Sequence, residues 1–98
     1  MAFTHSGYNV NVVASAEDAL EYLRKQDLDI LVLDLNLPGM NGVELAEKIS
    51  SEWPSIHIIA ITGDLERFRQ RSGDTSGFKK ILIKPIQLTD LLDAVRTV

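Results

Sequence analysis

The sequence predicts an α/β fold with a parallel sheet of about four strands, flanked by about four helices. Residues 30–33 are four consecutive apolar residues without polar alternation, which is typical of a strand buried on both faces. Residues 56–61 and 81–83 are two further apolar runs. Amphipathic segments lie between these runs. Strands that alternate with helices imply parallel pairing through right-handed crossovers.

The bulk properties bound the class of protein. The chain has 98 residues, which we interpret as one domain spanning residues 1–98. A net charge of −4 argues against general nucleic-acid binding, and the lack of cysteine excludes disulfides and thiolate chemistry. We find no signal peptide and no apolar run near the ~20 residues that cross a bilayer. We therefore expect a soluble cytoplasmic domain without a membrane partner.

The first half of the chain follows a strand, helix, strand pattern. Residues 1–7 lack periodicity and are interpreted as a loose end or the tail of a helix. Residues 8–14 are predicted to form a strand because they are rich in valine. Ser15 is predicted to cap a helix with Asp18 three positions later. The apolar stripe of this helix consists of Ala16, Ala19, Leu20 and Leu23.

The second half repeats this pattern. Asn41 is predicted to cap a helix that ends at Trp53, because Pro54 disfavours helical angles in the residue before it. Residues 65–71 are weakly helical and residues 72–77 are interpreted as a loop. The last helix begins near Asp90, which suits the helix dipole. Its predicted buried stripe is Leu88, Leu91, Leu92 and Val95.

Three polar residues stand where successive apolar strands end. They are Asp34, Thr62 and Lys84, and Pro85 stops the third strand because proline cannot donate to the sheet. Ligands gather at the carboxyl ends of parallel strands, so we expect these side chains to converge at one edge. A carboxylate so placed can attack phosphorus, while a hydroxyl and an ammonium stabilise the phosphoryl oxygens. A hard divalent cation would complete such a site.

The chain resembles the receiver domains of two-component response regulators. The resemblance rests on the segment from Leu33 to Gly42, with its Pro38-Gly39 pair, and on the motifs at residues 61–63 and 84–86. It implies a flavodoxin-like (CheY-like) sheet. It also implies that Asp34 is the phosphoacceptor, Thr62 the switch hydroxyl and Lys84 the charge partner. Asp34 and the main-chain carbonyl of Asn36 would bind Mg²⁺.

The sequence departs from the family pattern in two places. Family members begin with a strand that ends in two metal-binding acids, and roughly 20 residues corresponding to this strand and the next helix are missing. The metal site is therefore expected to be incomplete. Ile81 stands where the family usually has a switch aromatic, although Phe78 is nearby. The acids before Asp34 all lie on or beside the first predicted helix: Glu17, Asp18, Glu21, Asp27 and Asp29.

The missing strand would lie inside the sheet, between residues 8–14 and 30–34. We expect these two strands to pair directly, or an internal edge to stay open. The last helix is expected to expose apolar surface that a second copy or another partner covers. These expectations describe a truncated receiver, with a homodimer as one outcome.

The sequence is compatible with three functions. The first is a signalling module, not an enzyme, that accepts phosphate on Asp34 from a histidine kinase or a phosphotransfer protein. The second is a pseudo-receiver that binds partners without phosphorylation. The third is a phosphatase of the haloacid-dehalogenase type. That family requires a second acid two positions after the nucleophile, where this chain has Asn36, and a cap domain for which no room remains.

Overall fold

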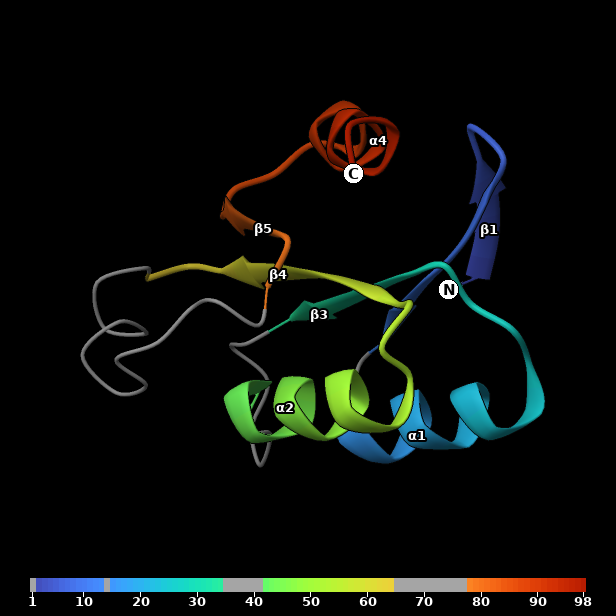
Figure 1. The fold of residues 1–98 in the computed structure, drawn as a ribbon. Coiled ribbons are helices and arrows are strands. Elements are labelled where there is room, and N and C mark those ends of the chain that lie inside the picture. The colour runs from blue at the N-terminus through green and yellow to red at the C-terminus, as the bar shows by residue number, and fades with distance from the viewer. Residues whose placement is uncertain (1, 14, 35–41, 65–77) are drawn as a thin grey trace.

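The computed structural model describes residues 2–13, 15–34, 42–64 and 78–98. These residues form one five-stranded sheet in the order β1-β2-β3-β4-β5, with helices on both faces (Figure 1). The predicted α/β fold class is confirmed. The strands are β1 (Ala2–His5), β2 (Tyr8–Val13), β3 (Ile30–Asp34), β4 (His57–Thr62) and β5 (Lys80–Ile83). The helices are α1 (Ala16–Lys25), α2 (Gly42–Glu52) and α4 (Leu88–Arg96).

The interpretation of residues 1–7 as a loose end or helix tail was wrong, because residues 2–5 form a strand. β1 pairs antiparallel with β2 and is joined to it by Ser6 and Gly7. The backbone φ angles of these two residues are 52° and 84°, which is the positive range that the two-residue turns of right-twisted hairpins require. Glycine adopts such an angle without steric cost, and Ser6 is the less favoured member of the pair.

The remaining strands are parallel, and β2 pairs directly with β3. Val10 lies opposite Ile30, and Val13 lies opposite Leu33. The expectation that these strands close the gap themselves is confirmed. Asp29, just before β3, binds the start of β2, because its carboxylate accepts a hydrogen bond of 2.8 Å from the Asn9 backbone N–H. The Asp29 N–H donates in turn to the Asn9 carbonyl at 3.0 Å.

The sheet separates two apolar clusters. On one face α1 and α2 pack against the strands, and on the other face α4 does so (Figure 1). We call the cluster on the face of α1 and α2 the lower cluster, and it contains Ala19, Leu23, Leu45, Ala46 and Ile49 from these helices. The upper cluster contains Leu91, Ala94 and Val95 from α4. Because β3 contributes alternate residues to both clusters, it is buried on both sides, as its unbroken apolar run predicts.

The helix ends follow from local hydrogen bonding. The Ser15 hydroxyl accepts from the Asp18 N–H at 3.1 Å, which confirms the predicted cap of α1. α2 ends before Trp53, as predicted. At the start of α4 the Asp90 carboxylate accepts from the Gln87 N–H at 2.9 Å. The predicted cap at Asn41 and the predicted helix over residues 65–71 lie outside the described residues.

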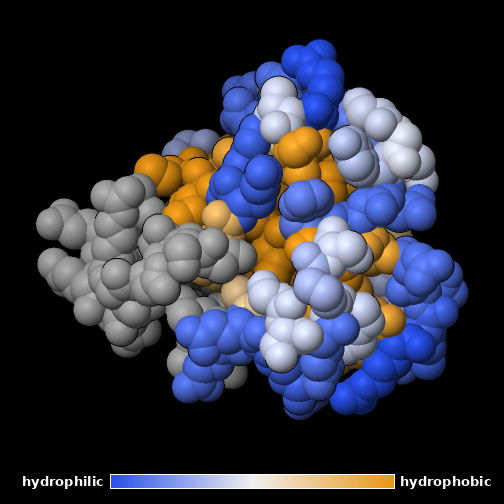
Figure 2. All heavy atoms as spheres, in the orientation of Figure 1, coloured by the Kyte–Doolittle hydropathy of each residue, from blue (hydrophilic) through white to orange (hydrophobic). Residues whose placement is uncertain are grey.

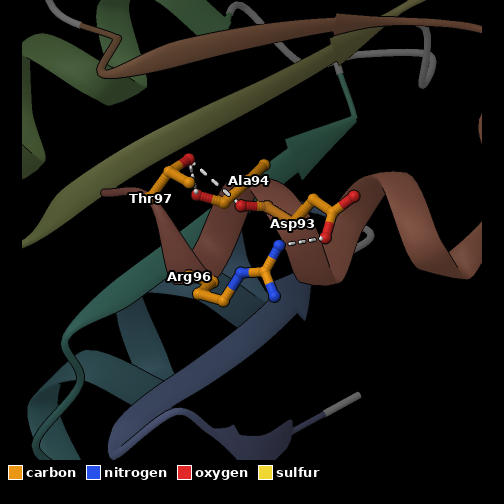
Figure 3. A network of polar contacts seen from close by, with 4 residues as sticks. All are labelled: Asp93, Ala94, Arg96 and Thr97. Atoms are coloured by element: carbon orange, nitrogen blue, oxygen red, sulfur yellow. Dashed lines mark hydrogen bonds and ion pairs between the residues drawn. The ribbon is translucent and has the colours of Figure 1, made fainter.

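The far end of α4 is closed by a short polar network (Figure 3). The Thr97 hydroxyl donates to the carbonyls of Asp93 and Ala94 at 3.1 and 3.4 Å. Arg96 donates to the Asp93 carboxylate at 2.9 Å. The Asp93 carbonyl also accepts from the Thr97 backbone N–H at 3.2 Å, so the side-chain bonds add to the backbone bond that closes the last turn.

The predicted apolar stripe of α4 is correct at Leu91 and Val95 and wrong at Leu88. Leu88 is 63% exposed and is the first residue of the helix. Hydrophobic side chains also reach the surface between α4 and the layer of α1 and α2 (Figure 2). Part of the upper face is covered by β1, which contacts α4 and adds Phe3 to the upper cluster. Within the described ranges no helix is both long and apolar enough to span a membrane.

Candidate functional site

The strand register brings the three predicted site residues to one edge of the sheet. Asp34, the last residue of β3, lies opposite Ile61 of β4. Thr62, the last residue of β4, lies opposite Ile83 of β5. Lys84 follows directly, and its backbone N–H donates to the Thr62 carbonyl at 2.8 Å. The parallel direction of β3, β4 and β5 therefore places all three at the carboxyl edge.

Asp34 and Lys84 are in direct contact although fifty positions separate them in the sequence. The Lys84 ammonium donates to a carboxylate oxygen of Asp34 at 2.8 Å. The side chains remain 24% exposed for Asp34 and 39% exposed for Lys84. The acid is thus held by a cation and still reaches solvent, where a phosphodonor could approach it. The Lys84–Pro85 peptide bond is cis.

Thr62 is placed differently from the charged pair. Its residue is only 1% exposed, and its hydroxyl oxygen accepts a hydrogen bond of 3.2 Å from the Asp64 backbone N–H. This is the local turn that threonine forms with the residue two positions on. We did not predict the contact, although the Thr62-Gly63-Asp64 sequence carries its signal. The bond holds the hydroxyl at the strand end beside the edge that Asp34 occupies.

The magnesium site that the resemblance implies lies only partly within the described residues. Mg²⁺ is held by carboxylates, carbonyls and water in an octahedral shell. Among residues 2–13, 15–34, 42–64 and 78–98, no three Asp, Glu or His side chains gather closely enough to hold a metal ion. Asn36, which the resemblance implicates through its carbonyl, lies outside these ranges, as do Pro38 and Gly39.

The position where the resemblance implies a switch aromatic is filled by a core residue. Ile81 is half-buried and packs against the lower cluster. Phe78 is a buried member of that same cluster. Neither residue stands at the strand end, so the described edge consists of the acid, the hydroxyl and the ammonium.

Comparison with known proteins agrees with this geometry. The family model of the response regulator receiver domain matches residues 1–96, and the chain belongs to this family. It is 34% identical over 94 residues to the TorCAD operon transcriptional regulatory protein TorR of Escherichia coli K12, covering 96% of this chain and 40% of that protein. It is 31% identical over 98 residues to the response regulator ArlR of Staphylococcus aureus Mu50, covering 100% of this chain and 44% of ArlR. The chain thus spans about two-fifths of the length of these relatives.

Solved structures show the same fold. A CheY-like receiver domain protein from Methanospirillum hungatei JF-1 superposes with a TM-score of 0.71 at 29% identity, covering 93% of this chain and 73% of that one. The BeF3-activated receiver domain of DrrB superposes with a TM-score of 0.69 at 25% identity, covering 85% of this chain and 69% of that one. The CheY-like fold class predicted from the sequence is therefore confirmed.

Proposed function

We propose that this chain is a phosphoacceptor receiver domain, which takes phosphate from a histidine kinase or a phosphotransfer protein onto Asp34. The observation that carries this proposal is the ion pair of 2.8 Å between Asp34 and Lys84 at the carboxyl edge of the sheet. A carboxylate paired with an ammonium at a strand end, still open to solvent, suits nucleophilic attack on a charged donor.

The transfer is a substitution at phosphorus. A carboxylate oxygen of Asp34 forms the new P–O bond while the P–N bond of the donor phosphohistidine breaks. The imidazole nitrogen leaves with the bonding electron pair, and the ring departs as neutral imidazole because its other nitrogen carries a proton. The product on this chain is an acyl phosphate. The Asp34 carboxylate supplies the nucleophile for this step.

Lys84 and Thr62 have supporting roles in this proposal. The Lys84 ammonium neutralises negative charge that gathers on the phosphoryl oxygens. Thr62 reorients to donate its hydroxyl hydrogen to another of these oxygens, a hydrogen that the bond accepted from the Asp64 N–H does not use. The resulting rearrangement at the ends of β4 and β5 is the signal that changes partner binding.

The names of the relatives support the proposal of a receiver function. TorR is named as a transcriptional regulatory protein and ArlR as a response regulator. The DrrB receiver was solved in a BeF3-activated form. The chain spans about two-fifths of TorR and ArlR, and the receiving step is the part of their activity that we propose for it.

A small phosphodonor tests the proposal. We expect intact-mass analysis after incubation with acetyl phosphate or phosphoramidate, with and without Mg²⁺, to show one added phosphoryl group. Asp34→Asn should lose the adduct completely because the nucleophile is gone. Asp27→Asn, which changes an exposed acid in the connection before β3 and away from this edge, should keep it. Hydroxylamine should remove the group, as expected for an acyl phosphate.

A second function follows from the donor set around Asp34. Because no three Asp, Glu or His side chains of the described residues gather into a metal-binding cluster, we propose as the second function a pseudo-receiver that binds partners without phosphorylation. Absence of an adduct on the folded wild-type chain, with both donors and with a phosphorylated phosphotransfer protein, would contradict the first function and favour this one. The phosphatase alternative has no comparable observation in its favour, since its three residue types are those that a receiver also uses.

A further inference from the structure

A cleft of about 500 Å³ lies between β2 and α1, and none of the three proposed site residues lines it. Its walls include Asn11 of β2 and, from α1, Asp18, Glu21, Tyr22 and Lys25. A volume of this size is typical of sites for small ligands. The cleft does not depend on the phosphoacceptor proposal, so the two can fail separately.

Asn11 is the unusual residue of this cleft. It is only 6% exposed, so more than nine-tenths of it is buried. Its side-chain amide makes no hydrogen bond to any other part of the chain that the structure describes. No fully enclosed side-chain nitrogen or oxygen in these ranges lacks a partner, so the amide of Asn11 must still reach solvent. The opening that it lines is the cleft.

An asparagine at this point works against the sheet. β2 is an interior strand, and Asn11 lies opposite Ala2 of β1 and Leu31 of β3. Its neighbours Val10 and Val12 are β-branched, whereas asparagine is depleted in strands. Buried polar groups are normally hydrogen-bonded, and sequence choices that break a local rule concentrate at functional sites. An apolar residue would serve the sheet better, so we look for a ligand that the amide would bind.

The walls of the cleft define the chemistry of that ligand. The Asn11 oxygen and the Asp18 carboxylate are acceptors, and Tyr22 offers a half-buried ring that packs on the lower cluster. Glu21 is already paired with Lys25 at 2.9 Å, and this contact lowers the pKa of the Glu21 carboxyl. The charge of Lys25 is therefore largely balanced, and the negative charge of Asp18 remains.

We propose that this cleft binds a small ligand whose planar cationic head group, of the amidinium or guanidinium class, is attached to a flat apolar body. The head group donates to the oxygens of Asn11 and Asp18. The flat body packs against the ring of Tyr22. An anionic ligand would meet the charge of Asp18, and a purely apolar one would leave the Asn11 amide without a partner.

Three isosteric probes test the class of ligand. Benzamidine is a planar cation, benzamide is its neutral counterpart and benzoate is the anion. We expect benzamidine to shift the side-chain amide signals of Asn11 and the ring signals of Tyr22 in NMR titrations. Its dissociation constant should be millimolar, as for a weak ligand of about ten heavy atoms. Benzamide should bind more weakly, and benzoate should give no saturable shift.

Matched variants test the residues. Asn11→Val should weaken benzamidine binding about two- to tenfold, the loss expected for one hydrogen bond. Asp18→Asn should weaken it about two- to fivefold at low salt and less at high salt. Asn9→Ala, on the same face of β2, and Glu17→Gln, in the same helical turn as Asp18, should leave it unchanged. Asn9 and Glu17 do not line the cleft.

Thermal unfolding separates a ligand-binding role from a structural one. Asn11→Val should melt at the same temperature as the wild type or higher, because it replaces an amide without a hydrogen-bond partner in the described residues by a β-branched apolar residue that strands favour. A clear loss of stability would indicate a structural asparagine and overturn the proposal. So would benzoate binding as well as benzamidine, or binding that Asn11→Val leaves unchanged.

One further probe distinguishes two sources of the same head group. Nα-acetyl-arginine methylamide carries a guanidinium as an arginine of a partner protein would, without a flat body. We expect it to bind more weakly than benzamidine. Tighter binding of the arginine derivative would contradict the small-ligand proposal and indicate a partner's side chain instead.

Discussion

The partial exposure of Asp34 and Lys84 limits how much their ion pair stabilises the fold. Pairs in this environment are screened by water and contribute about 0–1 kcal/mol to the free energy of unfolding. Both side chains keep contact with solvent, at 24% and 39% exposure. The pair is therefore better suited to holding the carboxylate in position for chemistry than to holding the chain together.

Lys84→Met tests this separation of roles. We expect the free energy of unfolding, measured by urea denaturation, to change by less than about 1 kcal/mol. The yield of the Asp34 adduct from acetyl phosphate should fall about tenfold or more, because charge on the phosphoryl oxygens loses its counter-ion. Lys79→Met removes an exposed lysine near β5 and should leave both quantities unchanged. A loss of several kcal/mol in Lys84→Met would instead assign the pair to structure.

At the residue scale, strand-end reasoning predicted which groups meet and not how each is held. The contact between Asp34 and Lys84 followed from two apolar runs that stop at charged residues. The bond that Thr62 accepts from Asp64 depends on the turn after β4, which the apolar pattern does not encode. The burial of Asn11 was also not predicted, because a polar residue among valines gives no sign of which face it occupies.

At the element scale, periodic segments were predicted well and the hairpin was missed. α1 and α4 have apolar residues at helical spacing, and β3 and β4 are continuous apolar runs. The apolar pattern alone therefore predicts these four elements. β1 has only four residues, too few to establish a period. The Ser6-Gly7 pair was the available signal, since such dipeptides favour tight turns. The stripe of α4 was wrong at Leu88, the first residue of the helix, because periodicity does not show where along a helix burial begins.

Asp29 is the element-scale link between the starts of three strands. Besides its contacts with Asn9, its carbonyl accepts from the His57 N–H at 2.9 Å. Only the bond to the carboxylate depends on the side chain. We expect Asp29→Ala to lower the free energy of unfolding by about 1 kcal/mol and to speed hydrogen exchange at the Asn9 amide.

The control for this prediction is Asp27→Ala, which changes an exposed acid in the same connection. Both measurements should stay at the wild-type value in that variant. Unchanged exchange at Asn9 in Asp29→Ala would show that the backbone bonds alone fix the register of β2 against β3.

At the scale of the whole molecule, the sheet couples the two apolar clusters. Neighbouring residues of β3 point to opposite faces, so Leu31 and Leu33 enter the lower cluster while Ile30 and Val32 enter the upper one. A substitution that destabilises the upper cluster should therefore also destabilise the lower one. Trp53 packs against the lower cluster and provides a fluorescent probe there.

Val95→Ala tests the coupling. Val95 is fully buried in the upper cluster, and we expect its truncation to cost about 2 kcal/mol. Trp53 fluorescence and far-ultraviolet circular dichroism should report the same shifted transition, as in two-state unfolding. As a control, Ile83→Ala at a half-exposed position should change stability much less. A Trp53 transition that stays at the wild-type midpoint in Val95→Ala would show that the faces unfold separately.

The antiparallel hairpin also has a kinetic consequence. β1 and β2 are joined by a two-residue turn, so they can zip together with little loss of chain entropy. β2 and β3 are separated by α1 and must close a much longer loop before they pair. The ribbon of β1 and β2 can therefore form early in folding and present a ready-made edge onto which β3 assembles.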